Sequence, residues 1–201
     1  MSMIHEAYLF DSALFERELV DVIAAAVRRD DLQPIYEFID RHIENCTSPY
    51  SGEELDECWR EELEEQDIQE LCDFALTRYY DAEDDIGLGY SWDALLNALK
   101  FLDLKFNAEY YVWGQEFSVD DFVLDPGGMG MGFVEAEDVA DMLLDLTRNK
   151  AAFSEKIKDN NIECEELLYE LSLEELEEAY DELINLFEIA KSERQGLLFV
   201  F

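Results

Sequence analysis

The run Leu197–Phe201 constrains the fold more than any other stretch, because all five of its residues are apolar. A continuous apolar run of this length is typical of a strand that is buried on both faces. The segment 3–10 also predicts a strand with two covered faces. Ile4, Tyr8 and Phe10 fall on one face of it, and Met3, Ala7 and Leu9 on the other. We expect the two strands to pair, which would bring both ends of the chain into one small sheet.

Between these strands the sequence is mostly helical. Apolar side chains recur at helical spacing in the segments 12–29, 35–43, 55–63, 68–79, 92–99, 136–147 and 176–190, with a short helix over 150–158 and another from Ile162. Capping residues mark several starts and ends: Asp11 and Ser12, Pro34, Ser51 with Glu54, Ser91, Ser172 with Glu175, and Gly196 as a C′ residue. We predict a helix-dominated α+β fold in a single domain, 1–201, whose small sheet includes the N-terminal and C-terminal strands. Within it we distinguish an acidic helical part, 11–90, from a part formed by 91–201 and the strand 3–10.

Two stretches do not follow a helical pattern. The loop 125–132, DPGGMGMG, holds four glycines in six residues, which disfavours both helix and ordinary strand. A short strand is predicted directly after it, at Phe133 and Val134. In the stretch 107–123, residues 110–113 favour a strand, whereas 119–123 fits a short turn of either kind, so its structure stays open.

The charge limits the class of partner. Asp and Glu total 51 against 14 Lys and Arg, a formal net charge of −37, although a hydrophobic fraction of 49% is too high for a disordered acidic chain. Such a charge repels phosphate groups and anionic membranes, and few cations are present to displace counterions from nucleic acid. We therefore expect no direct nucleic-acid or membrane binding, and a basic protein as the partner. The oligomeric state is not predicted.

The sequence predicts a cytoplasmic location. No apolar run approaches the roughly 20 residues of a membrane span, and the first ten residues lack a basic region and a cleavage-like site. The four cysteines form no C-x-x-C pair, so reduced and mostly buried thiols are expected at Cys46, Cys58, Cys72 and Cys164.

The densest run of charge lies between Glu53 and Asp85, with fifteen acids against Arg60 and Arg78 alone. A run of this kind is ordinarily a solvated helical face, and the alternative is an acidic docking surface. Met129 and Met131 in the glycine loop add adaptable apolar contacts, unless that loop is a plain connector. The candidate partner contacts are Glu53, Glu54, Glu57, Glu61, Glu64, Glu65, Met129 and Met131.

No residue pattern predicts catalysis, a metal site or a cofactor. The only histidines, His5 and His42, lie in a predicted strand and on an isoleucine-bearing helix, which favours structural or surface roles. The acidic loop 81–90 departs from a calcium-binding loop, because Ile86 stands where glycine is needed and Trp92, just beyond the loop, where glutamate is needed. The glycine loop does not match G-x-G-x-x-G and is surrounded by acids, so it is a poor phosphate site.

Three motifs lie in the second half of the chain: SWDALL at 91–96, FVEAEDV at 133–139, and FEIA at 187–190 with Gly196 and LFV at 198–200. Together with the opening MSMI they resemble the YfbM-like family, bacterial cytoplasmic proteins with a domain of unknown function. Members usually place Thr or Ser and then Pro where this chain has Glu135 and Ala136. The resemblance implies a compact α+β domain in a bacterium and supplies no catalytic residue.

These observations leave three functional hypotheses. The first is a non-catalytic inhibitor, immunity protein or adaptor that binds a basic partner by charge complementarity; a DNA mimic is a special case, with rows of carboxylates on helices at 53–70 and 163–182. The second is a small-ligand-binding protein or enzyme, with a pocket near Trp92, Trp113, Gly128 and Gly130. The third is that the charge serves only solubility or adaptation to high salt.

Overall fold

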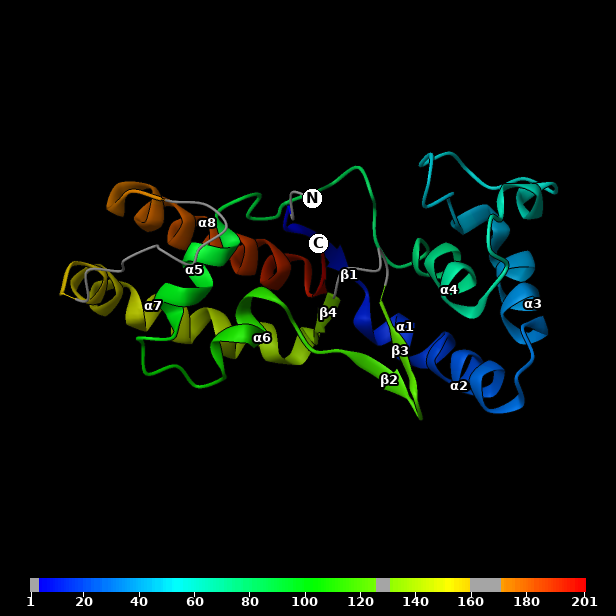
Figure 1. Ribbon diagram of the computed structural model, residues 1–201, viewed down its shortest axis with the longest axis horizontal. Helices are drawn as coiled ribbons and strands as arrows, with labels where there is room; N and C mark the ends of the chain where they lie inside the picture. The colour runs from blue at the N-terminus through cyan, green and yellow to red at the C-terminus, as the bar shows by residue number, and fades with distance from the viewer. Residues whose placement is uncertain (1–3, 126–130, 160–170) are drawn as a thin grey trace.

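A three-stranded antiparallel sheet lies at the centre of the molecule in the computed structural model, which describes residues 4–125, 131–159 and 171–201 (Figure 1). The strand order is β1-β5-β4, with β1 at Glu6–Phe10, β5 at Gly196–Val200 and β4 at Met131–Val134. β5 pairs with β1 in the register Ala7↔Phe199 and with β4 in the register Phe133↔Leu198. The predicted pairing of the terminal strands is confirmed, and the fold is a helix-dominated α+β fold.

Side chains that alternate along β5 separate two hydrophobic cores. Leu197 and Phe199 belong to the first core and Leu198 to the second, and all three are fully buried. The first core is covered by α5 (Trp92–Leu99), α6 (Ala108–Val112), α7 (Ala136–Asp159) and α8 (Leu173–Glu193). The second core is covered by α1 (Ser12–Glu18), α2 (Val20–Arg29), α3 (Gln33–His42), α4 (Ile68–Leu76) and the hairpin of β2 (Phe117–Val119) and β3 (Phe122–Leu124).

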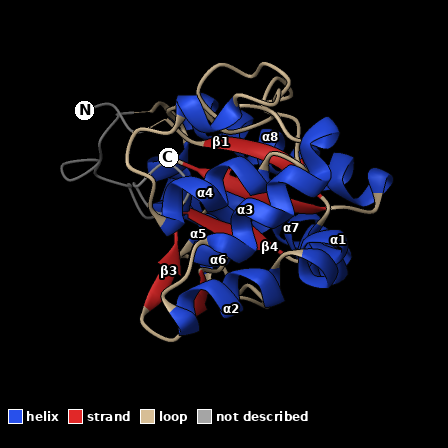
Figure 2. Cartoon of the chain, turned by 90° about the vertical axis from the view of Figure 1, so that its right-hand side faces the viewer, coloured by secondary structure: helices blue, strands red, loops and turns tan. Residues whose placement is uncertain are grey.

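The two groups of helices lie at opposite ends of the long axis, with the sheet between them (Figure 1). Figure 2 looks along that axis from the end that carries α1 to α4, and these helices stand in front of the strands. The sheet therefore divides the described part of the molecule into two ends. The β2–β3 hairpin follows α5 and α6 in sequence, yet it packs with the N-terminal helices.

Loops cover both edges of the sheet. Beside β1, the His5 and Gly89 backbones exchange hydrogen bonds, and the Ile86 N–H donates to the Ala7 carbonyl at 2.8 Å. Beside β4, Phe133 and Gln115 exchange hydrogen bonds at 2.9 and 2.8 Å. This second approach needs a glycine in β4, because a Cβ on Gly132 would lie 2.1 Å from the Trp113 carbonyl oxygen. The covered edges disfavour binding of a partner by strand addition.

His5 links the start of β1 to two segments that are distant in sequence. Its Nε2 lies 2.8 Å from the Val112 carbonyl oxygen, and the Leu88 N–H donates to its Nδ1 at 3.1 Å. The imidazole is fully buried, with the rings of Phe199 and Phe201 5.0 and 5.1 Å away. Burial lowers the pKa of His5 to about 4, against the opposing effect of the hydrogen bond to Val112. The residue is thus neutral and structural.

The predicted helix over 12–29 is two helices. Asp11 caps α1 as expected, since its carboxylate accepts the Leu14 N–H at 2.9 Å. Leu19, with φ at −107°, separates α1 from α2 while hydrogen bonds continue across it from Ile23 to Leu19 and from Leu19 to Phe15. The apolar periodicity runs through the break and includes Leu19, which is fully buried in the second core, but it does not reveal the break itself.

The stretch 107–123, for which the sequence predicted no definite structure, contains α6 and most of the β2–β3 hairpin. The Asn107 side chain caps α6. Tyr110 and Tyr111 favour strands intrinsically but are helical here. Both rings are buried, and both hydroxyls donate to carboxylates of α7: Tyr110 to Asp138 at 2.8 Å and Tyr111 to Asp145 at 2.5 Å. Tertiary contacts outweigh the strand propensity.

In the C-terminal part, the helices predicted at 136–147 and 150–158 form one helix, α7. The capping box of Ser172 and Glu175 is present at the start of α8. The end of α8 differs from the expectation, because Arg194 rather than Gly196 takes the left-handed conformation, with φ at +60°. Gly196 instead opens β5, where a Cβ would lie 2.2 Å from the Val134 carbonyl oxygen. The helix expected from Ile162, together with Cys164, lies outside the described residues.

Candidate functional site

The acid-rich segment, residues 53–66, is not the helix that the sequence predicted. Its only regular element is a 3₁₀ turn, η2 (Trp59–Glu62), and the α-helical conformation resumes at Ile68, as expected. Leu55 and Trp59 do point inward, with exposed fractions of 8% and 1%. The eight carboxylates between Glu53 and Glu65 would repel one another on successive turns of a helix. A loop buries the two apolar side chains without that arrangement.

One buried carboxylate fixes this loop to the protein. Glu70 of α4 has an exposed fraction of 5%. Its oxygens accept the backbone N–H groups of Glu64, Glu65 and Gln66 at 2.5, 3.0 and 2.5 Å, and the Tyr50 hydroxyl at 2.7 Å. Burial alone would raise the pKa of Glu70, but these hydrogen bonds outweigh it and hold the pKa below its usual value. Glu70 therefore stays ionised and holds the end of the segment against α4.

The middle of the segment is fixed through Trp59 and Arg60. The Trp59 indole N–H donates to an Asp40 carboxylate oxygen of α3 at 3.0 Å. The Arg60 guanidinium pairs with the other Asp40 oxygen and lies over the Tyr36 ring, 4.7 Å from its centroid. Arg60 is the only cation of the segment in sequence. Because it is directed to α3, it does not neutralise the acids around it.

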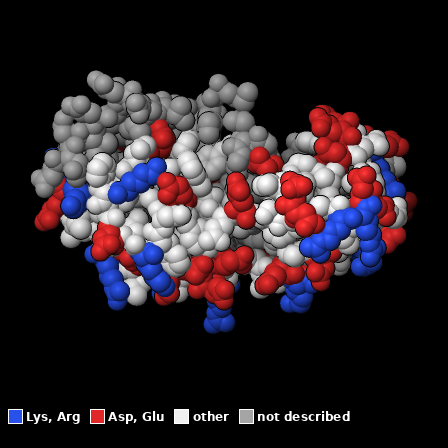
Figure 3. Space-filling model, turned by 60° about the horizontal axis from the view of Figure 1, so that its bottom comes forward, with Lys and Arg blue, Asp and Glu red and all other residues white. Residues whose placement is uncertain are grey.

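The six candidate glutamates are all exposed: Glu53, Glu54, Glu57, Glu61, Glu64 and Glu65. None of them forms an ion pair with another described residue. Elsewhere on the surface, as on the face in Figure 3, basic side chains lie among the acidic ones. The segment is thus a fixed loop of uncompensated negative charge.

Replacing Glu70 by alanine is expected to lower the free energy of unfolding by about 2 kcal/mol, since hydrogen bonds to a charged group contribute about 1.5–3 kcal/mol each and water replaces part of them here. Amide hydrogen exchange at residues 64–66 should accelerate strongly at the same time, because their N–H groups lose their acceptor. Glu70→Gln, which keeps one acceptor oxygen, should show a smaller effect, and Glu54→Ala should show none. Unchanged exchange at 64–66 in Glu70→Ala would contradict this role.

The two candidate pocket tryptophans lie together beside the end of the chain. Trp92 is buried, with an exposed fraction of 3%, and its ring meets Phe201 at a centroid distance of 5.0 Å. Trp113 is 40% exposed, and its ring centroid lies 6.2 Å from that of Trp92. Gly128, Met129 and Gly130 lie outside the described residues, and of Met131 only the backbone, in β4, is described.

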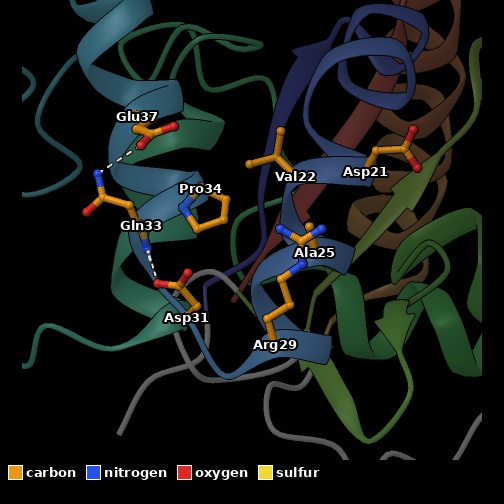
Figure 4. Close-up of a pocket in the computed structure, with 8 residues that line it drawn as sticks. All are labelled: Asp21, Val22, Ala25, Arg29, Asp31, Gln33, Pro34 and Glu37. Carbon is orange, nitrogen blue, oxygen red and sulfur yellow. Dashed lines mark hydrogen bonds between the residues drawn. The ribbon is translucent and has the colours of Figure 1, made fainter.

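Two adjoining hollows, which sequence reasoning missed, lie beside α2. The first, of about 410 Å³, opens between α2 and α3, whose side chains face one another across it in Figure 4. Its charged lining residues are Asp21, Arg29, Asp31 and Glu37. The second, of about 510 Å³, lies between α2, the starts of α3 and α4, and Phe122 of β3, and it shares Asp31 with the first. No sequence signal marks them, because they form only where separate elements meet.

Burial shifts the pKa values of several ionisable groups among the described residues. Burial raises the pKa of the Cys46 thiol to about 11 and raises that of Cys72, which makes both poor nucleophiles. Burial also raises the pKa of Asp73 to about 7, against a hydrogen bond from the Gln69 amide at 2.8 Å. Within the described ranges no three acidic, histidine or cysteine side chains are grouped to hold a metal ion.

Of the two rows of carboxylates predicted for a DNA mimic, residues 53–66 do not form a helix, residues 163–170 lie outside the described part, and residues 173–182 lie on α8. Across the described residues, no helix has both the length and the apolar character to cross a membrane. No family model matches the chain, and no similar protein is found among curated proteins or solved structures.

Proposed function

We propose that this protein is non-catalytic and acts by binding a basic protein partner through the acid-rich segment, as an inhibitor, immunity protein or adaptor would. One observation carries the proposal. Six glutamates of a single loop are exposed and unpaired with any described residue, while the backbone of that loop is held by the buried carboxylate of Glu70.

The fixed conformation favours recognition over solubility alone. Acids that serve only solubility need no defined positions, and a disordered tail would present them without bringing like charges together. Here the segment is joined to α3 and α4 by the Asp40 and Glu70 contacts. A preorganised set of charges loses less conformational entropy when a partner binds.

Electrostatics also favour a basic protein as the partner. Crowded glutamates repel one another, and lysine and arginine side chains of a partner would relieve that repulsion on binding. Attraction between opposite potentials speeds association and makes it sensitive to salt, because the Debye length is about 8 Å at physiological ionic strength. A basic protein therefore fits the segment better than a neutral small ligand does.

The test is retention of a partner from a lysate of the source cells. Tagged wild-type protein, Glu61→Gln/Glu64→Gln/Glu65→Gln and the matched control Glu178→Gln/Glu182→Gln/Glu188→Gln are immobilised, and bound proteins are eluted by a salt gradient and identified by mass spectrometry. All six positions are exposed, the control three on α8. A basic protein should elute from the wild-type and control columns at moderate salt, and from the column of the segment variant at clearly lower salt.

The same proteins at the same salt from all three columns would contradict the proposal. A nucleic-acid enzyme in the salt-sensitive fraction would favour DNA mimicry within it. The triple variant is not expected to unfold, since none of its three side chains makes an ion pair with a described residue and the Glu70 hydrogen bonds use backbone groups.

We further propose a cytoplasmic location and kinship of residues 91–201 with the YfbM-like family. The three motifs lie at the start of α5, at the junction of β4 with α7, and at the end of α8 with β5. A solved structure of a family member tests this, because the order and packing of these elements should superpose. A different strand order would contradict it.

A further inference from the structure

The second hollow, of about 510 Å³, has an apolar floor. Ala26 and Val27 of α2, Ile68 of α4 and Phe122 of β3 line it. All four are buried or half-buried and belong to the second core or pack against it. The floor is therefore set by the fold and is not a loose surface patch.

The rim of the same hollow is acidic. Asp30, Asp31 and Asp67 line it, and all three side chains are exposed. No lysine or arginine is among the residues that line it. An apolar floor beneath three carboxylates is suited to neither an anion nor a purely apolar ligand, because either would leave the carboxylates or the floor unmatched.

We infer that this hollow receives an arginine or lysine side chain from a basic segment of the partner, an inference that rests on the proposed function. These side chains have an apolar stem and a cationic head. The stem would lie on Val27, Ile68 and Phe122, and the head would meet Asp30 and Asp31. A second copy of this chain is a poor occupant, because its 51 acids face only 14 lysines and arginines.

The position of the hollow agrees with this occupant. Gln66 and Asp67, which line it, directly follow the exposed glutamates of the acid-rich segment. On the other side Asp31 is shared with the first hollow, whose charged lining is three acids, Asp21, Asp31 and Glu37, and one cation, Arg29 (Figure 4). An extended basic segment of the partner could therefore place one side chain in the second hollow, while the preceding and following side chains of that segment contact acidic residues on either side of it.

The experiment is an NMR titration of ¹⁵N-labelled full-length protein at about 0.15 M salt. The probes are an N-acetylated, amidated tri-arginine peptide and spermidine, which carry equal charge. The variants are Asp30→Asn/Asp31→Asn and Val27→Ser, with Glu178→Gln/Glu182→Gln on α8 as the charge-matched control. Asparagine suits position 30, where φ is +50°, and its amide oxygen at position 31 can still accept the Gln33 N–H.

We expect saturable shifts at residues 26–31, 67–68 and 122 with the peptide, and weaker binding of spermidine. Affinity for the peptide should fall about fivefold or more in Asp30→Asn/Asp31→Asn and measurably in Val27→Ser, and by less than about twofold in the control. Equal binding of spermidine, no effect of Val27→Ser, or shifts only at residues 53–65 would each overturn the inference. Shifts confined to 53–65 would leave the proposed function intact, and that function is judged separately by partner retention.

Discussion

Phe199→Ala is expected to lower the free energy of unfolding by about 3–5 kcal/mol, the range for loss of a large buried aromatic side chain. Phe199 is fully buried in the central strand and faces the first core. Leu198→Ala, one residue away and facing the second core, should cost about 2–5 kcal/mol. Both side chains belong to β5, which pairs with β1 on one side and β4 on the other. Each substitution is therefore expected to destabilise both ends of the molecule.

Two buried tryptophans report on the two cores separately. Trp92 belongs to the first core and Trp59 to the second, and their exposed fractions are 3% and 1%. With 5-fluorotryptophan incorporated, ¹⁹F NMR across a urea titration follows both signals in one sample. In the wild type and in both variants the two signals should change at the same denaturant concentration, which falls in the variants.

The exposed Val123 of β3, replaced by alanine, is a suitable control and should leave the midpoint nearly unchanged. Separate midpoints for Trp59 and Trp92, with Leu198→Ala moving only the Trp59 signal, would show that the sheet does not couple the cores. In that case the two groups of helices would be independent folding units joined by β5.

Much of the fold followed from local sequence patterns. The five apolar residues of 197–201 identified a strand with two covered faces, and their pairing with β1 is confirmed. Capping signals at Asp11 and Ser172 were also correct, because an N-cap depends only on residues within one turn. These features need no knowledge of distant contacts.

The errors arose where distant contacts decide the structure. The helix predicted from Ser51 depended on the spacing of Leu55 and Trp59. That spacing takes no account of the eight crowded carboxylates or of the hydrogen bonds that Glu70 accepts from residues 64–66. Tyr110 and Tyr111 were ambiguous because their helical conformation depends on Asp138 and Asp145 of α7. The hollow beside Asp30 needs four separate elements and had no local signal.

A loss of stability on acidification should be traceable to His5. Its folded-state pKa is about 4, because burial opposes the charged form, whereas the ordinary value is 6.5. The folded state therefore binds fewer protons than the unfolded state between these values, so stability is complete above pH 6.5 and declines as the pH falls to 4. The expected loss is about 3 kcal/mol, since a difference of one in pKa corresponds to about 1.4 kcal/mol.

The comparison that isolates this effect is wild type against His5→Gln, whose amide offers a donor and an acceptor but does not titrate. The many carboxylates and His42 titrate in both proteins, so their contributions cancel in the difference. At pH 7 the wild type should be the more stable of the two, and urea titrations should show this advantage shrinking by about 3 kcal/mol between pH 7 and pH 4. An advantage that does not change with pH would mean that folding does not lower the pKa of His5, and so that the imidazole is not held neutral.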